Sequence, residues 1–354
     1  MKTIDKRKPV LVTGANGYLA SWLVKELLED GITVHACVRN PDDKKKFQHL
    51  DDIASNSKGE IKYFKTDLLE DGSYEEAMKG CELVYHTASP FNLHIKDPIK
   101  ELINPAKLGT RNLLNQASVT SSVKRVVVTS SLVAIATDAI DCKKAPNGIL
   151  TEEIWNTTAS LEHQPYCYSK TLAEKEAWEI SKTQNSWDLV VINPGFVMGP
   201  VLNPNNTTSE SFSFLKQFGD GTLKAGVANI GIGVVDVRDL AQAHFKAGFT
   251  PEASGRYITM GHNSSLLEMV KTLAPKYGNA YPIPKKALPK WIAWLIAPLV
   301  DKAITRKIVS NNVNIKYFAD NSKIKRELGM SFRPLKVTME DAFQSLINAG
   351  VFKK

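Results

Sequence analysis

The sequence contains few cysteines, and none stands close to another. A disulfide framework needs paired cysteines and a structural zinc site needs closely spaced ligands such as CxxC, so neither is expected and no metal site is predicted. A chain without disulfides suits a reducing compartment, so we expect a cytoplasmic protein. The four cysteines are Cys37, Cys81, Cys142 and Cys167.

Long apolar runs are also lacking. The one segment that suggests a membrane, WIAWLIAPLV at 291–300, contains a proline and falls well short of the span length of about 20 apolar residues. We expect an amphipathic helix that packs on the protein or covers a pocket, and no membrane partner. The basic N-terminal stretch leads directly into a strand pattern, without the apolar region and cleavage site of a signal peptide.

The basic charge is not organised as in a nucleic-acid-binding protein. The formal net charge of +8 suits an anionic ligand. The densest basic runs, KRK at 6–8 and KKK at 44–46, have no interleaved aromatic residues and belong to no recognisable nucleic-acid module. No nucleic-acid partner is therefore expected.

What the chain does contain is an alternation of β-branched runs with helical patterns over its first 195 residues. This pattern is typical of βαβ units, and the strands read as continuous apolar runs, as in a sheet covered on both faces. We predict an α/β fold, a Rossmann-type doubly wound parallel sheet with a smaller, mainly helical C-terminal lobe. Strands are expected at 10–14, 33–38, 61–65, 83–88, 125–131 and 189–194, and helices at 17–30, 73–80, 98–117 and 165–183.

Two lobes are expected because 354 residues exceed the size, about 250–300 residues, at which a single core usually stops growing. After Pro200 the sequence changes to a loop-like stretch rich in Asn, Pro, Thr and Ser. We place an NADP-binding Rossmann domain at 1–200 and a substrate-binding lobe at 201–354. The strand-then-helix pattern at 232–250 is expected to return to the first domain, and the protein to be a monomer or a homodimer.

The stretch VLVTGANGYLAS places Gly14, Gly17 and Ala20 directly after the first strand and at the start of a helix. The glycines allow a tight turn and a close approach of the backbone to a pyrophosphate, which then lies at the helix N-terminus. A second strand about 20 residues later gives the motif the context of a dinucleotide site.

The end of the second strand distinguishes the two nicotinamide cofactors. An NAD site usually has an acidic residue there, whereas an arginine accommodates the 2′-phosphate of NADP. The strand ends in CVRN, so Arg39 follows it, and lysines 44–46 add positive charge. Asp42 and Asp43 oppose this charge, but we expect them to face solvent. The pattern favours NADPH.

The stretch PYCYSK at 165–170 contains two tyrosines and one lysine. Residues four apart share a helix face, so Tyr166 lies beside Lys170 whereas Tyr168 points elsewhere. A neighbouring ammonium would stabilise the phenolate and lower the pKa of Tyr166, making it a general acid near neutral pH. By itself this spacing is weak, because such pairs occur by chance in many helices.

Three separated motifs, TGANGYLA (13–20), VVVTSS (126–131) and YCYSK (166–170), together resemble the extended short-chain dehydrogenase/reductase family. The resemblance is strongest to its dihydroflavonol-reductase-like branch, which includes cinnamoyl-CoA, methylglyoxal and other aldehyde and ketone reductases. It covers roughly residues 8–245 well and the remainder only loosely. As a set the motifs are specific, which favours a catalytic role for Tyr166.

The resemblance implies roles for the residues that match the family's motifs. Ser131, Tyr166 and Lys170 match its catalytic residues. Arg39 and Lys46 match the positions that hold the adenosine 2′-phosphate. The other matched cofactor positions are Gly14, Asn16, Gly17, Tyr18 and Leu19 in the glycine motif, Asp67 and Leu68 at the adenine, Thr87, Ala88 and Ser89 beyond it, and Pro194, Gly195, Phe196 and Val197 at the nicotinamide.

These roles imply the reduction of a small-molecule aldehyde or ketone to an alcohol by NADPH. Ser131 would donate a hydrogen bond to the carbonyl oxygen, and Tyr166 would protonate this oxygen as hydride arrives. Lys170 would also hold the nicotinamide ribose. The alternatives are an NAD-dependent sugar-nucleotide epimerase or dehydratase, a hydroxysteroid-type dehydrogenase and a non-enzymatic NADPH sensor. Arg39 argues against the first, and the Tyr166–Lys170 pair against the last.

The substrate is less closely defined. Plant dihydroflavonol reductases carry an asparagine five residues after the catalytic serine, where this chain has Ala136, so dihydroflavonol specificity loses its main support. Apolar side chains that are candidates for the substrate site favour an apolar or aromatic carbonyl compound. They are Phe91, Phe196, Phe212, Phe214, Trp291 and Trp294.

Other polar residues are expected to have structural roles. Asp236 and Asp239 should cap the helix that contains LAQAH. His86 lies in the middle of a strand and should pack in the core. His163 is interpreted as an ordinary loop histidine, and Cys167 as a buried residue that faces away from Tyr166.

Overall fold

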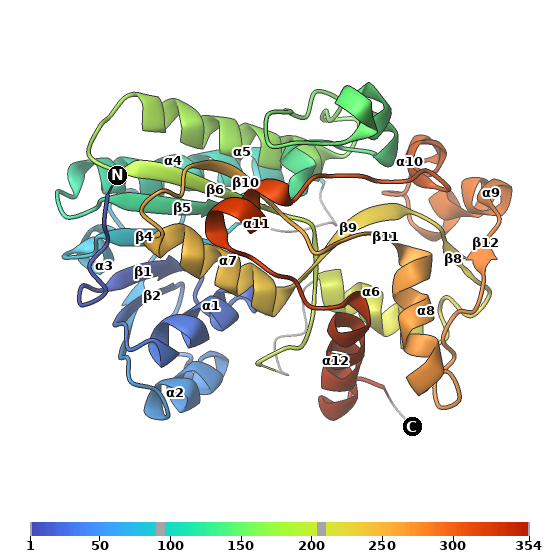
Figure 1. The fold of residues 1–354 in the computed structure, drawn as a ribbon, viewed down its shortest axis with the longest axis horizontal. Helices are drawn as coiled ribbons and strands as arrows, with labels where there is room; N and C mark the ends of the chain where they lie inside the picture. Colours follow the sequence, from blue (N-terminus) through green and yellow to red (C-terminus); the bar gives the residue numbers. More distant parts are fainter. Residues whose placement is uncertain (1, 90–95, 204–209, 353–354) are drawn as a thin grey trace.

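The computed structural model describes residues 2–89, 96–203 and 210–352 (Figure 1). Its centre is a seven-stranded sheet in the order β10-β6-β5-β4-β1-β2-β3, and every neighbouring pair is parallel. The predicted parallel sheet is confirmed. Its strands are β1 (Val10–Thr13), β2 (Val34–Val38), β3 (Ile61–Lys65), β4 (Leu83–His86), β5 (Arg125–Thr129), β6 (Asp188–Pro194) and β10 (Gly255–Thr259).

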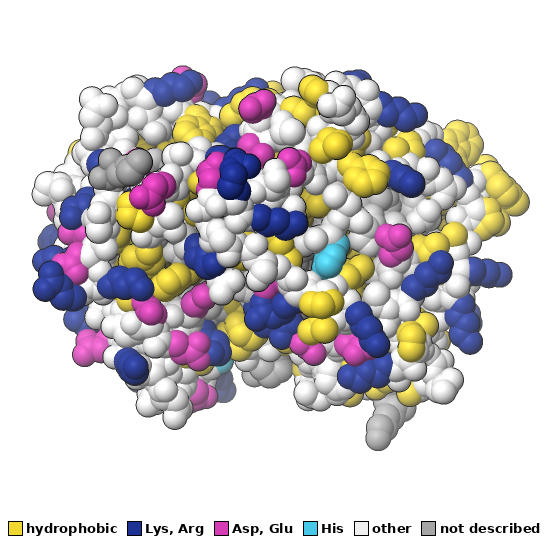
Figure 2. All heavy atoms as spheres, viewed as in Figure 1, with side chains coloured by type: hydrophobic (Ala, Val, Ile, Leu, Met, Phe, Trp, Pro, Cys, Tyr) yellow, Lys and Arg dark blue, Asp and Glu magenta, His cyan; other side chains and the backbone are white. Residues whose placement is uncertain are grey.

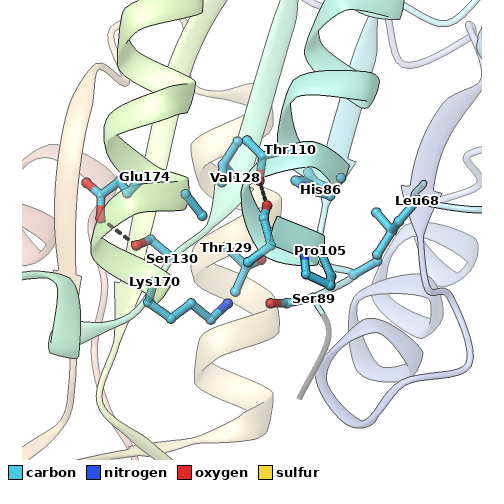
Figure 3. Close-up of a pocket in the computed structure, with 14 residues that line it drawn as sticks. Leu68, His86, Ser89, Pro105, Thr110, Val128, Thr129, Ser130, Lys170 and Glu174 are labelled. Atoms are coloured by element: carbon cyan, nitrogen blue, oxygen red, sulfur yellow. Dashed lines mark hydrogen bonds between the residues drawn. The ribbon is translucent and has the colours of Figure 1, made fainter. Parts of the chain in front are cut away.

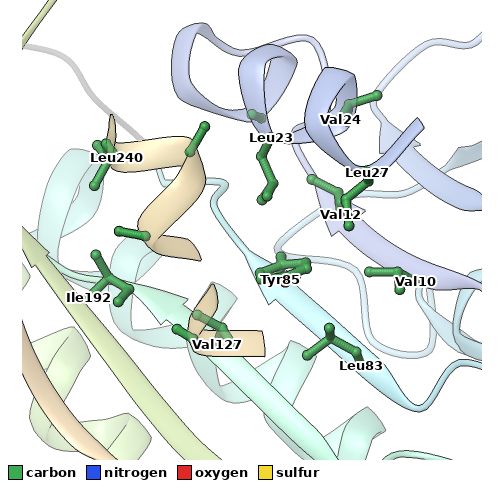
Figure 4. Close-up of a cluster of buried hydrophobic side chains, with 14 of the residues drawn as sticks. Val10, Val12, Leu23, Val24, Leu27, Leu83, Tyr85, Val127, Ile192 and Leu240 are labelled. Carbon is green, nitrogen blue, oxygen red and sulfur yellow. The ribbon is translucent and has the colours of Figure 1, made fainter. Parts of the chain in front are cut away.

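Helices cover both faces of this sheet, as continuous apolar strands require. Successive residues of β1 point to opposite sides, so Val10 and Val12 join one core cluster whereas Leu11 joins the other. Figure 4 shows the first cluster, in which Leu23 and Leu27 of α1 pack over the sheet. On this face lie α1 (Tyr18–Glu29), α2 (Gln48–Ser55), α7 (Val237–Phe249) and α11 (Ser322–Leu328), and on the other α3 (Glu75–Met78), α4 (Asn104–Val119) and α5 (Pro165–Lys182).

The strand order reverses at β1. From β1 the chain continues outward to β2 and β3, then crosses back so that β4 pairs with the other side of β1. In open parallel sheets, ligands bind outside the carboxyl ends of the strands at such a reversal. The loops after Thr13 and His86 therefore border the expected cofactor cleft.

The C-terminal lobe is built around a smaller sheet of β7 (Phe196–Met198), β9 (Gly231–Asp236) and β11 (His262–Ser265), in the order β11-β9-β7. Two short strands, β8 (Val227–Ala228) and β12 (Ala287–Leu288), also pair. As expected, residues beyond 262 are mainly helical. The helices of this lobe are α6 (Glu210–Gly219), α8 (Leu266–Tyr277), α9 (Lys290–Val300), α10 (Arg306–Asn312) and α12 (Leu335–Asn348).

The segment expected to return to the first domain, 232–250, is divided in the structure. Its strand, β9, pairs with β7 and β11, whereas its helix, α7, lies beside α1 on the large sheet. A later strand, β10, also enters the large sheet by pairing with β6. Among the described residues, no helix is long and apolar enough to cross a membrane.

Candidate active site

The glycine turn joins β1 to α1 at the reversal point. Gly14 has a φ of +60°, and a Cβ at this position would lie 3.1 Å from the Cβ of Ala88, so a larger residue would be both strained and crowded. Gly17 caps α1 without a side-chain hydrogen bond, which leaves the first helical N–H groups to other acceptors. Asn16 lies between these glycines, and Tyr18 and Leu19 begin α1.

Thr13 holds the ends of β1 and β4 together. Its hydroxyl oxygen accepts the backbone N–H groups of Thr87 (3.0 Å) and Ala88 (2.9 Å) and lies 3.1 Å from His86 Nδ1. Because both lone pairs are occupied, the hydroxyl proton is directed to Nδ1. Burial and the charge of Lys170 lower the pKa of His86 to about 3, so its imidazole is neutral and structural, as expected.

The predicted phosphate-binding residues lie beyond β2. Arg39 is exposed, and within the described part of the chain it forms no ion pair. Lys46 lies in a short helical turn with its ammonium 2.8 Å from the Asp43 carboxylate. Asp43 was expected to face solvent, but it neutralises the charge of Lys46. Arg39 is therefore a better anion ligand than Lys46.

The predicted adenine-binding pair forms the loop after β3. The Asp67 carboxylate accepts the Leu69 N–H (2.8 Å) and shapes this turn. Leu68 lines the cleft and lies directly over Gly109 of α4, where a Cβ would be 3.2 Å from its side chain. The Asn112 amide donates to the Leu68 carbonyl (3.1 Å) and holds the loop in place.

The three candidate catalytic residues come from two neighbouring elements. Ser131 follows β5, and its hydroxyl accepts the Val133 N–H (3.3 Å). Tyr166 and Lys170 occupy the first turns of α5, which begins at Pro165. Figure 3 shows Lys170 and Ser89 pointing into the same cleft, which is also lined by Ala88 and Leu68.

The electrostatics of the tyrosine differ from expectation. Lys170 was predicted to lower the pKa of Tyr166, but burial raises this pKa instead, with a further rise from neighbouring Cys167. Burial also lowers the pKa of Lys170 to about 8, partly offset by the Glu174 carboxylate. Burying both groups disfavours both charged forms. Tyr166 therefore stays protonated at neutral pH, which is the form that a proton donor needs.

Glu174 was not predicted from the sequence as a site residue, and it is almost fully buried behind Lys170. Its carboxylate accepts hydrogen bonds from the Ser130 hydroxyl, Asn193 Nδ2 (2.8 Å) and Arg256 Nε (2.6 Å). The sequence does contain a signal for Glu174, because Tyr166, Lys170 and Glu174 follow one another at intervals of four residues.

Arg256 of β10 completes this buried group, and no local pattern indicated it. Besides Glu174, its guanidinium donates to the carbonyl oxygens of Glu152 (2.8 Å) and Ile154 (2.7 Å) and lies 4.1 Å from the centre of the Trp155 ring. Because each charge has several partners, burying the pair leaves neither charge uncompensated. Asn193 also donates to the Ser131 carbonyl (3.1 Å), which links the group to the end of β5.

The segment from Pro194 to Val197, predicted to border the nicotinamide, joins the end of β6 to the start of β7. A Cβ at Gly195 would lie 2.5 Å from the Gly233 carbonyl oxygen, so only glycine fits there. Phe196 packs edge-on against Phe214, with ring centroids 5.7 Å apart. The Tyr18 hydroxyl donates to the Gly199 carbonyl (2.8 Å), which connects the chain just after this segment to the start of α1.

The remaining apolar candidates are dispersed. Phe212 is buried against Tyr18, Trp291 and Trp294 are exposed on α9, and Phe91 lies outside the described residues. Ala136 is buried in an apolar cluster with Leu132 and Ile258. Phe196 and Phe214 therefore contact each other, whereas the two tryptophans lie elsewhere, on α9.

The other polar residues are mostly structural. Asp236 caps α7 by accepting the Arg238 N–H (2.9 Å), as expected, whereas Asp239 pairs with Arg333. His163 is not an ordinary loop residue, because it is buried with Nε2 2.7 Å from the Asp138 carboxylate. All four cysteines are buried and unpaired. The described residues include no cluster of His, Cys, Asp and Glu that could hold a metal ion.

Comparison with known proteins agrees with this geometry. Residues 10–260 match the NAD-dependent epimerase/dehydratase family. The chain belongs to this family. A cinnamoyl-CoA reductase of Medicago truncatula is 36% identical over 340 residues, 95% of this chain and 95% of that protein.

Two further relatives extend the likeness. A bifunctional dihydroflavonol 4-reductase/flavanone 4-reductase of Malus domestica is 32% identical, covering 98% of this chain and 91% of that protein. The yeast methylglyoxal/isovaleraldehyde reductase, solved with NADPH, has a TM-score of 0.77 at 25% identity, covering 97% of this chain and 99% of that one. The predicted resemblance to the dihydroflavonol-reductase-like branch is confirmed.

Proposed function

We propose that this protein is an NADPH-dependent reductase that converts an apolar or aromatic aldehyde or ketone to its alcohol. The observation that carries the proposal is the position of Lys170, whose buried amine points into the cleft at the reversal of strand order, on the same helix as Tyr166. The predicted oxidoreductase activity and NADPH cofactor agree with the relatives described above. We further propose a cytoplasmic monomer or homodimer.

The residues at the cleft fit NADPH. Gly14 has no side chain to block the approach of the pyrophosphate to the backbone. The residue after β2 is Arg39, where an NAD site would usually have a carboxylate. Arg39 and Lys46 would bind the 2′-phosphate, Asp67 and Leu68 would border the adenine, and Lys170 would hold the ribose. Bound NADPH would supply the hydride.

The proton that completes the reduction comes from a residue of the chain itself. As hydride adds to the carbonyl carbon, the π electrons move to oxygen, where a hydrogen bond from Ser131 stabilises the growing charge. Tyr166 then gives its proton to this oxygen. An alkoxide is about as basic as hydroxide, whose conjugate acid, water, has a pKa of about 15.7. Even a phenol with a raised pKa therefore transfers its proton downhill.

The alternatives are distinguished by cofactor and substrate. Arg39 follows β2 where an NAD site usually has an acidic residue, which disfavours an epimerase that recycles NAD. A hydroxysteroid-type dehydrogenase would use the same Tyr166 and Lys170 and would differ in its substrate. Purified protein that carries tightly bound NAD would nevertheless favour the epimerase.

Turnover with a panel of carbonyl compounds tests the proposal, measured as the loss of NADPH absorbance with aliphatic aldehydes, diketones, aromatic aldehydes and flavanonols. Tyr166→Phe should lower kcat by about 10²–10⁴-fold, because the proton donor is lost, while NADPH still binds. Tyr168→Phe, two residues along the same helix, is the matched control and should keep its activity. Unchanged turnover in Tyr166→Phe would exclude this phenol as the acid.

A further inference from the structure

The outer face of α9 is an exposed apolar surface. Every residue from Trp291 to Val300 is apolar. The inner side packs on α10 through Ala293 and Ala297. The outer side is open to solvent, with 67% of Trp291 and 85% of Leu299 exposed. We call it the α9 face, made up of Trp291, Trp294, Leu295, Ile296, Leu299, Val300 and the following Ile304.

This face lies at one end of the molecule, away from the cofactor cleft. Figure 1 places α9 and α10 at the edge of the C-terminal lobe, and Figure 2 shows apolar side chains gathered there beside lysines and arginines. Contiguous exposed apolar surfaces are rare on monomeric proteins and mark interaction sites. The face therefore has the character of an interaction site for a partner that accepts apolar side chains.

Positive charge flanks α9 along the chain. Residues 285–307 contain six cationic side chains and a single carboxylate, Asp301. None of the six forms an ion pair within residues 2–89, 96–203 and 210–352. The guanidinium of Arg306 lies 4.5 Å from the centre of the Trp294 ring. The six are Lys285, Lys286, Lys290, Lys302, Arg306 and Lys307.

We propose that the α9 face binds an anionic lipid surface, with α9 lying flat in the interface. An interfacial helix buries one apolar face at the boundary of headgroups and acyl chains, and flanking lysines and arginines contact anionic headgroups. Tryptophan is favoured at that depth. No membrane partner was predicted from the sequence, because residues 291–300 are too few to span a bilayer. A helix that lies flat in the interface needs no such length.

The charge distinguishes this partner from a second copy of the chain. A two-fold dimer places the same patch of both subunits together, so the two sets of six cations would repel each other. An anionic bilayer can bury the apolar side chains and pair the cations with its headgroups at the same time. This inference concerns a surface separate from the cleft and goes beyond the proposed reductase activity.

Sedimentation of the full chain with lipid vesicles tests the inference. The protein should bind vesicles in which about one third of the phosphatidylcholine is replaced by phosphatidylserine, and bind pure phosphatidylcholine far more weakly. Added salt should release it, because the headgroup attraction is screened. Tryptophan emission should shift to the blue as Trp291 and Trp294 leave water.

Two pairs of variants separate the contributions. The double variant Lys285→Glu, Lys286→Glu should weaken vesicle binding at least about 25-fold, because each lost cation should cost about five-fold in affinity. The matched control, Lys58→Glu with Lys62→Glu in the first lobe, should bind as the wild type does. Trp291→Ser with Leu299→Ser should weaken vesicle binding by more than about tenfold, and the equally exposed Val119→Ser should not. Reduction of a water-soluble aldehyde should be unchanged in all four.

Three outcomes would overturn the inference. The wild type could remain in the supernatant with anionic vesicles, or the control variants could lose as much binding as the α9 variants. The wild type could also be dimeric by light scattering and become monomeric in Trp291→Ser with Leu299→Ser, which would assign the face to a second copy of the chain.

Discussion

The large sheet, at the end that carries the candidate catalytic residues, and the C-terminal lobe are held together by different means. On the sheet side, polar groups are fixed by buried hydrogen bonds, as in Thr13 between β1 and β4 and in Glu174 behind Lys170. On the lobe side, the contacts are aromatic edges such as Phe196 against Phe214. Hydrogen bonds are directional, whereas apolar packing tolerates changes of shape.

The contrast suggests a division of labour between the two sides. The directional side should fix the cofactor and the proton donor, which every substrate shares. The apolar side should set which carbonyl compound fits. Substitutions on the sheet side should therefore affect all substrates alike, and substitutions on the lobe side should change selectivity.

The largest effect is expected for Lys170→Met. Loss of the amine that positions the cofactor should lower kcat by about 10³-fold for every substrate. The same variant should be more stable at pH 7, because the folded state holds the pKa of Lys170 near 8 and burying its charged form costs up to about 3 kcal/mol.

The pH dependence of unfolding checks this second effect. Between about pH 8 and the ordinary lysine pKa of 10.5, the unfolded chain binds more protons than the folded one, so wild-type stability should rise relative to Lys170→Met. Parallel stability curves for the two proteins would show that Lys170 is not held at a lowered pKa.

The next largest effect is expected for Glu174→Gln. Arg256 would remain buried without its carboxylate, which should cost about 3–5 kcal/mol of stability in a denaturant melt. The pKa of Lys170 should also fall, since Glu174 raises it, and the alkaline limb of the rate profile should move to lower pH. Glu176→Gln, on the same helix but paired with Arg111 at the surface, should cost less than about 1 kcal/mol.

Cofactor preference gives an intermediate effect. Arg39→Asp should lower the ratio of NADPH to NADH efficiency by about 10–100-fold, because a charge-assisted bond to the phosphate is replaced by repulsion. Lys46→Asp should change the ratio less, because Asp43 already neutralises that lysine. If Lys46→Asp had the larger effect, Lys46 would be the principal phosphate ligand.

The smallest effect is expected on the lobe side. Phe214→Ala should lower kcat/KM for aromatic aldehydes by about tenfold and change that for small aliphatic aldehydes little. Phe249→Ala, in a half-buried aromatic pair on the sheet side, is the matched control and should leave the selectivity unchanged. An equal loss for all substrates in Phe214→Ala would break the proposed contrast between the two sides.

The sequence predicted the parts whose signals are local. Six strands were found within a few residues of their ends, because β-branched apolar runs bounded by turns define them. The spacing of Tyr166 and Lys170 correctly placed them on one helix, and Gly14 was correctly placed directly after a strand.

The parts that depend on distant contacts were not found. β10 joins the sheet only by pairing with β6, and Arg256 meets Glu174 across 82 positions of the chain. The raised pKa of Tyr166 also escaped prediction, since burial depends on the whole fold. Trp291 and Trp294 were expected near substrate because composition alone does not say which side of a helix is covered.

The buried cysteines have a consequence for a protein that handles aldehydes. Many carbonyl compounds that accept hydride are also attacked by thiolates, and a thiol reacts only in its deprotonated form. Burial keeps Cys37, Cys81, Cys142 and Cys167 out of contact with solvent and raises the pKa of Cys81 and Cys167 to about 12. A reductase built in this way offers its own electrophilic substrates almost no sulfur to modify, and so resists self-inactivation when they accumulate.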